Sequence, residues 1–235
     1  MQLVQLKDVT RTYQLDAVDV PALSDINLEI YSDRFTVVSG ASGSGKTTLL
    51  NLIGCIDRPN RGTVSVAGQA VHTLSDNALS DFRAQHLGFV FQNFNLLPVL
   101  TAYENVEYPL LLARAPKQRR RERVAALLEA VGLTEFARHR PGQLSGGQRQ
   151  RVAIARALAT QPRLVLADEP TANLDSKTGA AIIGLMRRMQ RDHHVSFVFS
   201  SHDPKVLAEA DDAVTLQDGR ITAVERRNAS AEPMP

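Results

Sequence analysis

The sequence predicts an α/β fold: a core of parallel strands and helices, with antiparallel strands near its N-terminus and an inserted lobe of helices. Short apolar runs rich in β-branched residues alternate with segments of helical periodicity, the usual pattern of a parallel sheet. Between about residues 93 and 160 the strand pattern stops and helical periodicity remains. Because 43% of the 235 residues are apolar, the chain can bury a substantial core.

The first part of the predicted core contains three strands and one helix. Polar and apolar residues roughly alternate over residues 3–9 and 26–30, as they do in half-exposed antiparallel strands. The run FTVVSG at residues 35–40 is apolar and ends in glycine, which predicts a buried strand that leads into a loop. Residues 46–54 then have the spacing of a helix.

The inserted lobe is predicted from two helical segments within residues 93–160. Apolar residues recur at three- and four-residue spacing over residues 119–133 and 146–159. Gly132 lies near the end of the first segment, where glycine commonly ends a helix. We therefore expect a lobe built from helices alone.

The last part of the chain returns to the core. Apolar runs at residues 163–168 and 195–201, separated by a helical segment at 176–192, predict two further parallel strands. Asp218-Gly219 lies between two strand-like runs and predicts a hairpin. We expect residues 1–225 to form one domain and the polar residues 226–235 to form a flexible tail.

The glycine-rich segment GASGSGKT at residues 40–47 fits the phosphate-loop pattern G-x-x-x-x-G-K-[ST]. Glycine lets backbone N–H groups turn toward a phosphate, and the helix that follows offers its positive end. The Lys46 ammonium would neutralise phosphate charge, and the Thr47 hydroxyl would be a ligand of Mg²⁺. The residues predicted to bind the nucleotide are Gly40, Ser42, Gly43, Gly45, Lys46, Thr47 and Thr48.

Two acidic residues follow the predicted strand at 163–168, and a histidine follows the one at 195–201. Beside a phosphate loop, Asp168 is the expected Mg²⁺ partner, and Glu169 is placed to polarise the water that attacks the γ-phosphate. His202 could reach the same phosphate and water from its own strand end. Ordinary solvated carboxylates and a structural histidine are the alternative interpretation of these residues.

A second segment suited to anions lies about a hundred residues after the phosphate loop. In LSGGQ, Ser145 is placed to cap a helix, and Gly146 and Gly147 expose backbone N–H groups at its start. One compact chain cannot easily bring both the phosphate loop and the LSGGQ segment to the same γ-phosphate. We therefore expect two copies to close head to tail around two nucleotides, each completing the site of the other.

Together these motifs resemble the ATP-binding cassette (ABC) ATPase family over nearly the whole chain, and LSGGQ at residues 144–148 matches its signature motif. The resemblance implies a P-loop NTPase (RecA-like) core, ATP and Mg²⁺ as ligands, and ATP hydrolysis. It implies further roles for four residues. Gln92 would contact Mg²⁺ and water, Tyr13 would stack on adenine, and Gln148 and Asp175 would lie at the nucleotide between the two copies.

Longer segments, among them FVFQNFNLLPVLTAYENVEYPL and ADEPTANLDSKTG, resemble the subgroup that contains lipoprotein-release, macrolide-export and cell-division ATPases. That resemblance implies integral membrane permease subunits as partners and a cytoplasmic position on the inner face of the membrane. The chain departs from the usual family pattern at two places, and both concern its placement in this subgroup. Asp33-Arg34 replaces the usual Gly-Glu, and Ala172 replaces a glycine.

Composition and charge indicate which classes of partner and function remain. A formal net charge of +2 gives little reason to expect a nucleic-acid partner, and we interpret the basic run at residues 117–123 as a solvated helix face. The single cysteine, Cys55, is expected in the core, and no secretion signal or membrane span is expected. A regulatory, non-transport membrane complex and a soluble ATPase acting on nucleic acid remain as alternative functions.

Overall fold

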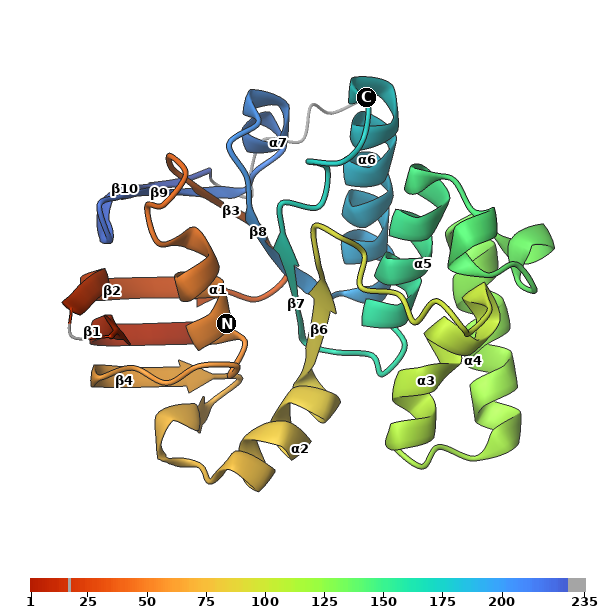
Figure 1. The fold of residues 1–235 in the computed structure, drawn as a ribbon, viewed down its shortest axis with the longest axis horizontal. Coiled ribbons are helices and arrows are strands. Elements are labelled where there is room, and N and C mark those ends of the chain that lie inside the picture. Colours follow the sequence, from red (N-terminus) through yellow and green to blue (C-terminus); the bar gives the residue numbers. More distant parts are fainter. Residues whose placement is uncertain (17, 228–235) are drawn as a thin grey trace. The chain divides into compact units, whose positions relative to one another are not determined.

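The computed structural model describes residues 1–16 and 18–227, and the chain divides into two compact units (Figure 1). The first unit comprises Met1–Leu79 and the chain from Ser196 onward, and the second comprises Ser80–Val195. Most of the predicted tail, residues 228–235, lies outside the described residues, while its first residue, Arg226, ends a strand.

An antiparallel sheet forms one part of the first unit. Its strands β1 (Gln2–Leu15), β2 (Val18–Tyr31), β4 (Arg61–Val66) and β5 (Gln69–Ala70) lie in the order β2-β1-β4-β5. The two predicted antiparallel strands are confirmed, and they pair with each other, with Leu6 opposite Leu28 and Val9 opposite Ile26. β1 and β2 are longer than predicted because register shifts interrupt the alternation that marks a strand in the sequence.

Parallel strands form the other part of the first unit. The phosphate-loop strand β3 (Phe35–Ser39) pairs in parallel with β8 (Ser196–Ser200) on one side and with β9 (Asp212–Gln217) on the other. Buried rings of Phe35 and Phe199, 4.1 Å apart between centroids, pack β3 against β8. The helices of this unit include α1 (Lys46–Ile53), which makes contacts with β8 and β2, and the short α7 (Pro204–Ala208).

The predicted hairpin is confirmed at the end of the first unit. β10 (Arg220–Arg226) pairs antiparallel with β9, and Gln217 lies opposite Arg220 across a two-residue turn. The turn residues Asp218 and Gly219 have φ angles of +47° and +73°. Two positive φ angles are the requirement of a type I′ turn, which explains the Asp-Gly sequence.

In the second unit, β6 (Leu87–Val90) pairs in parallel with β7 (Leu164–Asp168). Residues 93–160 contain helices and turns but no strand, as the sequence predicts. The helices are α3 (Ala102–Leu112), α4 (Lys117–Ala130) and α5 (Gly146–Ala157), with 3₁₀ turns at Thr134–Phe136 and Pro141–Gln143. The long helix α6 (Ser176–His193) follows β7 and packs against α5.

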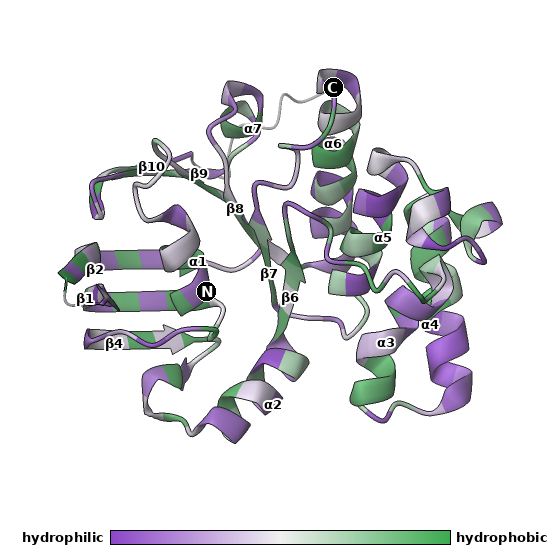
Figure 2. Cartoon of the chain, viewed as in Figure 1, coloured by the Kyte–Doolittle hydropathy of each residue, from purple (hydrophilic) through white to green (hydrophobic). Residues whose placement is uncertain are grey.

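Several elements are absent from the predictions. These are β4, β5, β6, α2 (Asp76–His86), α3, α7 and the 3₁₀ turns, of which the first is Val71–Thr73. Figure 2 shows why the two strand types differ in the sequence: β6 and β7 are mostly apolar, whereas β1, β2 and β4 alternate. β6 has only four residues, too few for a clear strand pattern.

The expected position of the single cysteine is confirmed. Cys55 is buried in the core, with 2% of its surface exposed. No helix of the described residues combines the length and the apolar character that a membrane span requires.

Arg34, which stands where the family pattern usually has a glutamate, makes an ion pair in the first unit that explains this difference. The Arg34 guanidinium donates two hydrogen bonds of 2.7 Å to the carboxylate of Asp212, and it also donates to the carbonyl of Asp211. Asp212 is buried, and it begins the strand that pairs with β3. This two-pronged ion pair fixes the start of β3 against the start of β9.

We predict that Arg34→Ala lowers the free energy of unfolding by about 3 kcal/mol, because it leaves the buried Asp212 carboxylate without its cation. Urea denaturation measures the loss. The matched control is Arg220→Ala, which breaks an exposed 3.2 Å ion pair with Asp25 and is expected to cost less than about 0.5 kcal/mol. Equal losses in the two variants would contradict the role of burial.

Candidate nucleotide site

The phosphate loop connects β3 to α1 in the first unit. Gly40, Gly43 and Gly45 have φ angles of +155°, +79° and +103°, a backbone region that favours glycine. A Cβ atom at Gly40 would lie 2.2 Å from the carbonyl oxygen of Leu216, and one at Gly45 would lie 2.6 Å from that of Ala22. Glycine is therefore required at both positions by conformation and by space.

Lys46, the first residue of α1, extends its side chain back over the loop. Its ammonium donates 2.9 Å hydrogen bonds to the carbonyls of Gly40 and Ala41, and the residue is only 7% exposed. These bonds place a positive charge at the loop and at the N-terminus of a helix, where an anion is favoured. Ser42, Gly43 and Thr47 are exposed, so they are open to a ligand.

Ser44 is a loop residue that the sequence analysis did not select. It is 5% exposed, and within the described part of the chain its buried hydroxyl oxygen has no hydrogen-bond partner. Its carbonyl accepts a 3.0 Å hydrogen bond from the N–H of Gly219. Ser44 occupies a variable position of the phosphate-loop pattern. The sequence therefore does not predict its hydrogen bond with Gly219, which lies 175 residues away in the hairpin.

His202 lies at the same edge of the parallel strands as the phosphate loop. β3 and β8 are parallel neighbours with Val38 beside Ser200, so the loop and His202 both follow the carboxyl ends of these strands. The N–H of Ser201 donates to the carbonyl of Val38, which continues the pairing up to the histidine. His202 is exposed. The first unit thus brings these two predicted parts of the site together.

Tyr13 is held from two directions on β1. Its hydroxyl donates a 2.7 Å hydrogen bond to Asp57, and the Arg11 guanidinium lies 4.4 Å from the ring centroid. Arg11 also donates to the same carboxylate oxygen of Asp57, at 2.9 Å. The ring is therefore fixed in orientation before any ligand arrives, a condition that suits a stacking surface.

In the second unit, the predicted acidic residues and Gln92 also follow neighbouring strand ends. β6 and β7 are parallel with Val90 beside Ala167, so Gln92 and the Asp168-Glu169 pair lie at one edge. The Asn173 side chain amide donates 3.0 Å hydrogen bonds to the Gln92 carbonyl and to Asn93. These contacts tie the segment after β6 to the segment after β7.

The turn at Glu169 is strained and braced. Glu169 has a φ angle of +43°, which costs free energy for a residue with a side chain. Its carbonyl accepts a 3.1 Å hydrogen bond from the N–H of Ala172. The side chain of Gln150, fully buried on α5, donates a 2.7 Å hydrogen bond to the carbonyl of Pro170. Gln150 is a second residue that the sequence analysis missed, since a glutamine within a helical segment gives no signal of burial.

The predicted helix cap at Ser145 is confirmed. The Ser145 hydroxyl accepts a 3.2 Å hydrogen bond from the N–H of Gln148, and the Gln148 side chain accepts a 2.8 Å bond from the N–H of Ser145. This reciprocal pair is a capping box. A Cβ at Gly147 would lie 2.6 Å from a methyl carbon of Thr178, so the start of α5 lies against the start of α6.

Asp175 caps α6 within its own chain. One carboxylate oxygen accepts hydrogen bonds from the N–H groups of Lys177 and Thr178, at 3.1 and 3.0 Å. The hydrogen bonds from Thr178 and Lys177 hold the pKa of the Asp175 carboxyl below its usual value. Its negative charge therefore offsets the positive end of α6.

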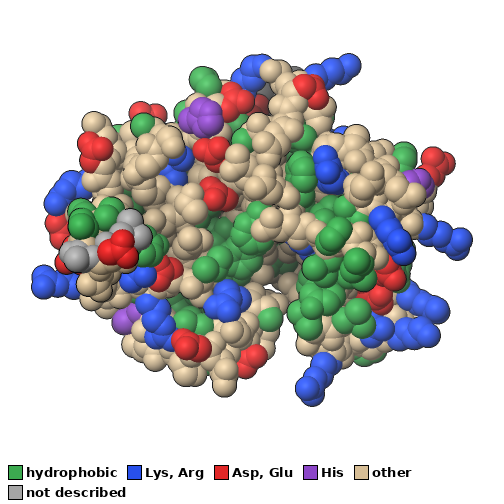
Figure 3. Space-filling model, viewed as in Figure 1, with side chains coloured by type: hydrophobic (Ala, Val, Ile, Leu, Met, Phe, Trp, Pro, Cys, Tyr) green, Lys and Arg blue, Asp and Glu red, His purple; other side chains and the backbone are tan. Residues whose placement is uncertain are grey.

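An apolar hollow of about 360 Å³ opens in the second unit. Its walls include Phe89, Phe91, Pro109, Leu112 and Arg156. Exposed apolar side chains occur on α3 and on the segment before it, and Figure 3 shows hydrophobic side chains gathered over α3. They are Leu97, Val99, Tyr108, Leu111 and Leu112, between 38% and 73% exposed. So much exposed apolar surface on one unit is typical of a surface that binds a partner.

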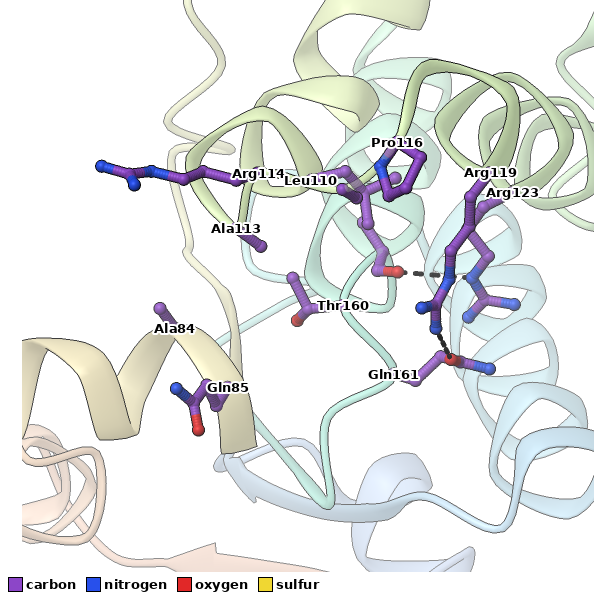
Figure 4. A pocket seen from close by; sticks show the side chains of 12 residues that line it. Ala84, Gln85, Leu110, Ala113, Arg114, Pro116, Arg119, Arg123, Thr160 and Gln161 are labelled. Atoms are coloured by element: carbon purple, nitrogen blue, oxygen red, sulfur yellow. Dashed lines mark hydrogen bonds between the residues drawn. The ribbon is translucent and has the colours of Figure 1, made fainter.

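Arginines line a second hollow of the same unit, of about 340 Å³ (Figure 4). Arg123 donates hydrogen bonds to the carbonyls of Leu158 and Ala159 at the end of α5, and burial lowers the pKa of its guanidinium. Arg119 donates to Gln161 at 3.4 Å. The interpretation of residues 117–123 as a solvated face is therefore only partly right, because Arg123 and the half-buried Arg120 make internal contacts.

Among protein families, the ABC transporter family matches residues 23–172 of the chain. A relative in Thermotoga maritima, named as an uncharacterized ABC transporter ATP-binding protein, is 46% identical over 96% of each chain. The macrolide export ATP-binding/permease protein MacB of Rhodopirellula baltica is 45% identical over 97% of this chain. The chain spans about a third of the length of MacB, 34%.

Solved structures give matches of similar extent. The chain is similar to the ATP-binding cassette MJ0796, solved as a dimer in a post-hydrolysis state with ADP and Pi, with a TM-score of 0.89 and 42% identity. The match covers 97% of this chain and 100% of the other. These findings confirm the predicted fold class, a P-loop NTPase core with an antiparallel β-subdomain and a helical region, and the resemblance drawn from the motifs.

We predict that Gln150→Leu lowers the free energy of unfolding by about 1 to 3 kcal/mol, because it leaves the Pro170 carbonyl without its buried donor. Urea denaturation checks this. The same substitution at the exposed Gln118, which donates to Glu122 on α4, is the control and is expected to cost less than about 0.5 kcal/mol. A Gln150→Leu protein as stable as the control would contradict the bracing contact.

Proposed function

The chain belongs to the ABC transporter family of ATP-binding proteins and is an ATP-hydrolysing subunit of that family, and on that premise we propose that it works as a head-to-tail pair. Two copies would enclose two ATP molecules. Their closing on ATP and opening after hydrolysis would drive separate membrane permease subunits, which places the pair on the inner face of the membrane.

The observation that carries the paired arrangement is the uneven charge of two neighbouring helix starts. α6 has the Asp175 carboxylate at its N-terminus, whereas the first turn of α5 contains no acidic residue. The positive end of α5 is therefore left for an anion from outside the helix. Ser145, Gly146, Gly147 and Gln148 would present it to the γ-phosphate of the ATP held by the other copy. The dimeric MJ0796 structures support this arrangement.

Within one copy, the phosphate loop would hold the β- and γ-phosphates. Backbone N–H groups between Gly40 and Gly45, together with those of Thr47 and Thr48 at the start of α1, would surround the phosphates. The Lys46 ammonium would exchange its loop carbonyls for phosphate oxygens. Tyr13, already oriented by Asp57 and Arg11, would stack on the adenine ring.

Mg²⁺ is the metal that the candidate ligands suit. Thr47, Asp168 and Gln92 offer a hydroxyl, a carboxylate and an amide oxygen, and Mg²⁺ prefers such hard oxygen donors. The described residues contain no cluster of three His, Cys, Asp or Glu side chains that could hold a metal alone. This agrees with an ion held by few protein ligands together with phosphates and water. When bound, Mg²⁺ would neutralise charge on the phosphates.

Glu169 would polarise the attacking water. The braced turn fixes the position of Glu169, and a base must lie within hydrogen-bond distance of the proton that it accepts. His202, beyond the end of β8, would contact the γ-phosphate and orient the water. The Gln92 side chain would contact Mg²⁺ and this water, while the segment that follows it, held by Asn173, would relay the state of the site.

The apolar hollow beside α3 would receive a helix of the permease. Exposed Leu112 lines it, and Arg156 on its wall donates hydrogen bonds to the carbonyls of Phe94 and Asn95, in the segment that follows Gln92. A docked helix would therefore contact the same segment that leads from the nucleotide. MacB joins such a cassette to a permease in one chain, which supports a permease partner of the macrolide-export or lipoprotein-release type.

We expect Glu169→Gln to abolish most ATP turnover, by about 10² to 10⁴-fold, because the amide cannot accept a proton from water. ATP binding should stay within about twofold, since the phosphate contacts are unchanged. Phosphate release and equilibrium binding measure the two effects. Glu129→Gln, on the exposed side of α4, is the control and should retain full turnover. Unchanged phosphate release from the Glu169 variant would refute its role as base.

Pairing is tested with Ser145→Arg in the Glu169→Gln background. The larger cationic side chain at the start of α5 should fill the space for the γ-phosphate and prevent the ATP-dependent dimer, measured by light scattering. Ser75→Arg is the matched control, because Ser75 is also an exposed serine whose hydroxyl accepts an N–H at the start of a helix, α2. An undiminished dimer in the Ser145 variant would refute the head-to-tail pairing.

A further inference from the structure

The tip of the β9–β10 hairpin contacts the phosphate loop directly. Gly219, the second turn residue, is buried although it lies at the tip of a hairpin. We propose that Gly219 is a positioning residue that holds the phosphate loop in its binding conformation. This inference rests on the proposed role of residues 40–48 in binding ATP, and it adds a residue that lies outside that loop.

Two backbone hydrogen bonds connect Gly219 to its surroundings. Its N–H donates to the carbonyl of Ser44 at 3.0 Å, and its carbonyl accepts from the N–H of Ser24 on β2 at 2.8 Å. The hairpin also meets the start of the loop, where the Leu216 carbonyl lies against Gly40. The loop is thus held at both ends by one hairpin, which is itself anchored to β2.

The bond to Ser44 determines the direction of a group that a phosphate would meet. A trans peptide is planar, so its C=O and its N–H point in opposite directions. When the Ser44 carbonyl points at Gly219, the N–H of Gly45 must point away from the hairpin. A Cβ at Gly45 would collide with the Ala22 carbonyl, so the side toward β2 is already filled. The hairpin therefore aims one N–H of the loop before ATP arrives.

Two constraints favour glycine at position 219: the positive φ angle of the turn and the lack of space for a Cβ. The lack of space is the stricter one. At φ +73°, a Cβ there would lie 2.7 Å from the carbonyl oxygen of Ala22. Gly68, in the β4–β5 hairpin, occupies the same place in a similar two-residue turn: its φ is +84°, and Ala67 before it has φ +51°. A Cβ at Gly68 would meet nothing within 4 Å. The comparison separates the strain of the turn from the packing of Gly219 against β2.

The experiment compares Gly219→Ala with Gly68→Ala in the full chain. Both variants introduce the same left-handed strain, but only in the first does the added Cβ press on the Ala22 carbonyl of β2, which would shift the Gly219 N–H away from the Ser44 carbonyl. We expect Gly219→Ala to raise the Kd and KM for ATP about tenfold, with a smaller change in kcat at saturating ATP. Gly68→Ala should stay within about twofold. Equal affinities in the two variants would overturn the proposal.

Two further measurements keep the test decisive. Gly219→Asn relieves much of the φ strain but keeps the Cβ, so it should bind ATP as weakly as Gly219→Ala. In the unaltered protein, amide hydrogen exchange of Gly219 should slow when ATP is added, while that of Gly68 should not change. No response at Gly219 would refute the coupling even if the variants fail to fold.

Lys46→Ala separates this inference from the proposed function. Loss of ATP binding in Lys46→Ala together with normal binding in Gly219→Ala would refute only the positioning role. Normal ATP binding in Lys46→Ala would instead refute the phosphate site on which the inference rests.

Discussion

Backbone N–H groups bind a phosphate only where the chain turns them outward and leaves the space before them free. The phosphate loop meets this constraint with three glycines at positive φ, and α5 meets it with a serine cap followed by Gly146 and Gly147. The same requirement of helix geometry thus appears once in each unit, with a loop in one and a capping box in the other.

Parallel pairing explains why scattered residues gather at one edge in each unit. β3 beside β8 brings the phosphate loop and His202 to neighbouring strand ends, and β6 beside β7 does the same for Gln92 and Glu169. Parallel strands are buried on both faces, so polar side chains reach solvent mainly beyond the carboxyl ends of the strands. Binding and catalytic residues are therefore common at such edges. The positive φ of Glu169 is part of the cost of this placement.

Local signals account for what the sequence predicts correctly. The Asp218-Gly219 turn, the Ser145 cap and the strand before the phosphate loop each depend on residues within a few positions of one another. What escaped prediction depends on distant partners. Ser44 and Gln150 gain their roles from Gly219 and Pro170, and the bulges in β1 hide most of a strand whose alternation they interrupt.

Arg34 stands where the family usually has a glutamate. The contact of Arg34 with a residue distant in the sequence explains how the fold accommodates this difference. The family's acidic residue would face the buried Asp212 carboxylate, and two like charges there would repel each other. Arginine reverses the sign and makes two parallel hydrogen bonds. Because Asp212 begins β9, this pair fixes the strand whose far end carries the hairpin against the phosphate loop. A residue outside every motif therefore supports the nucleotide site through one strand.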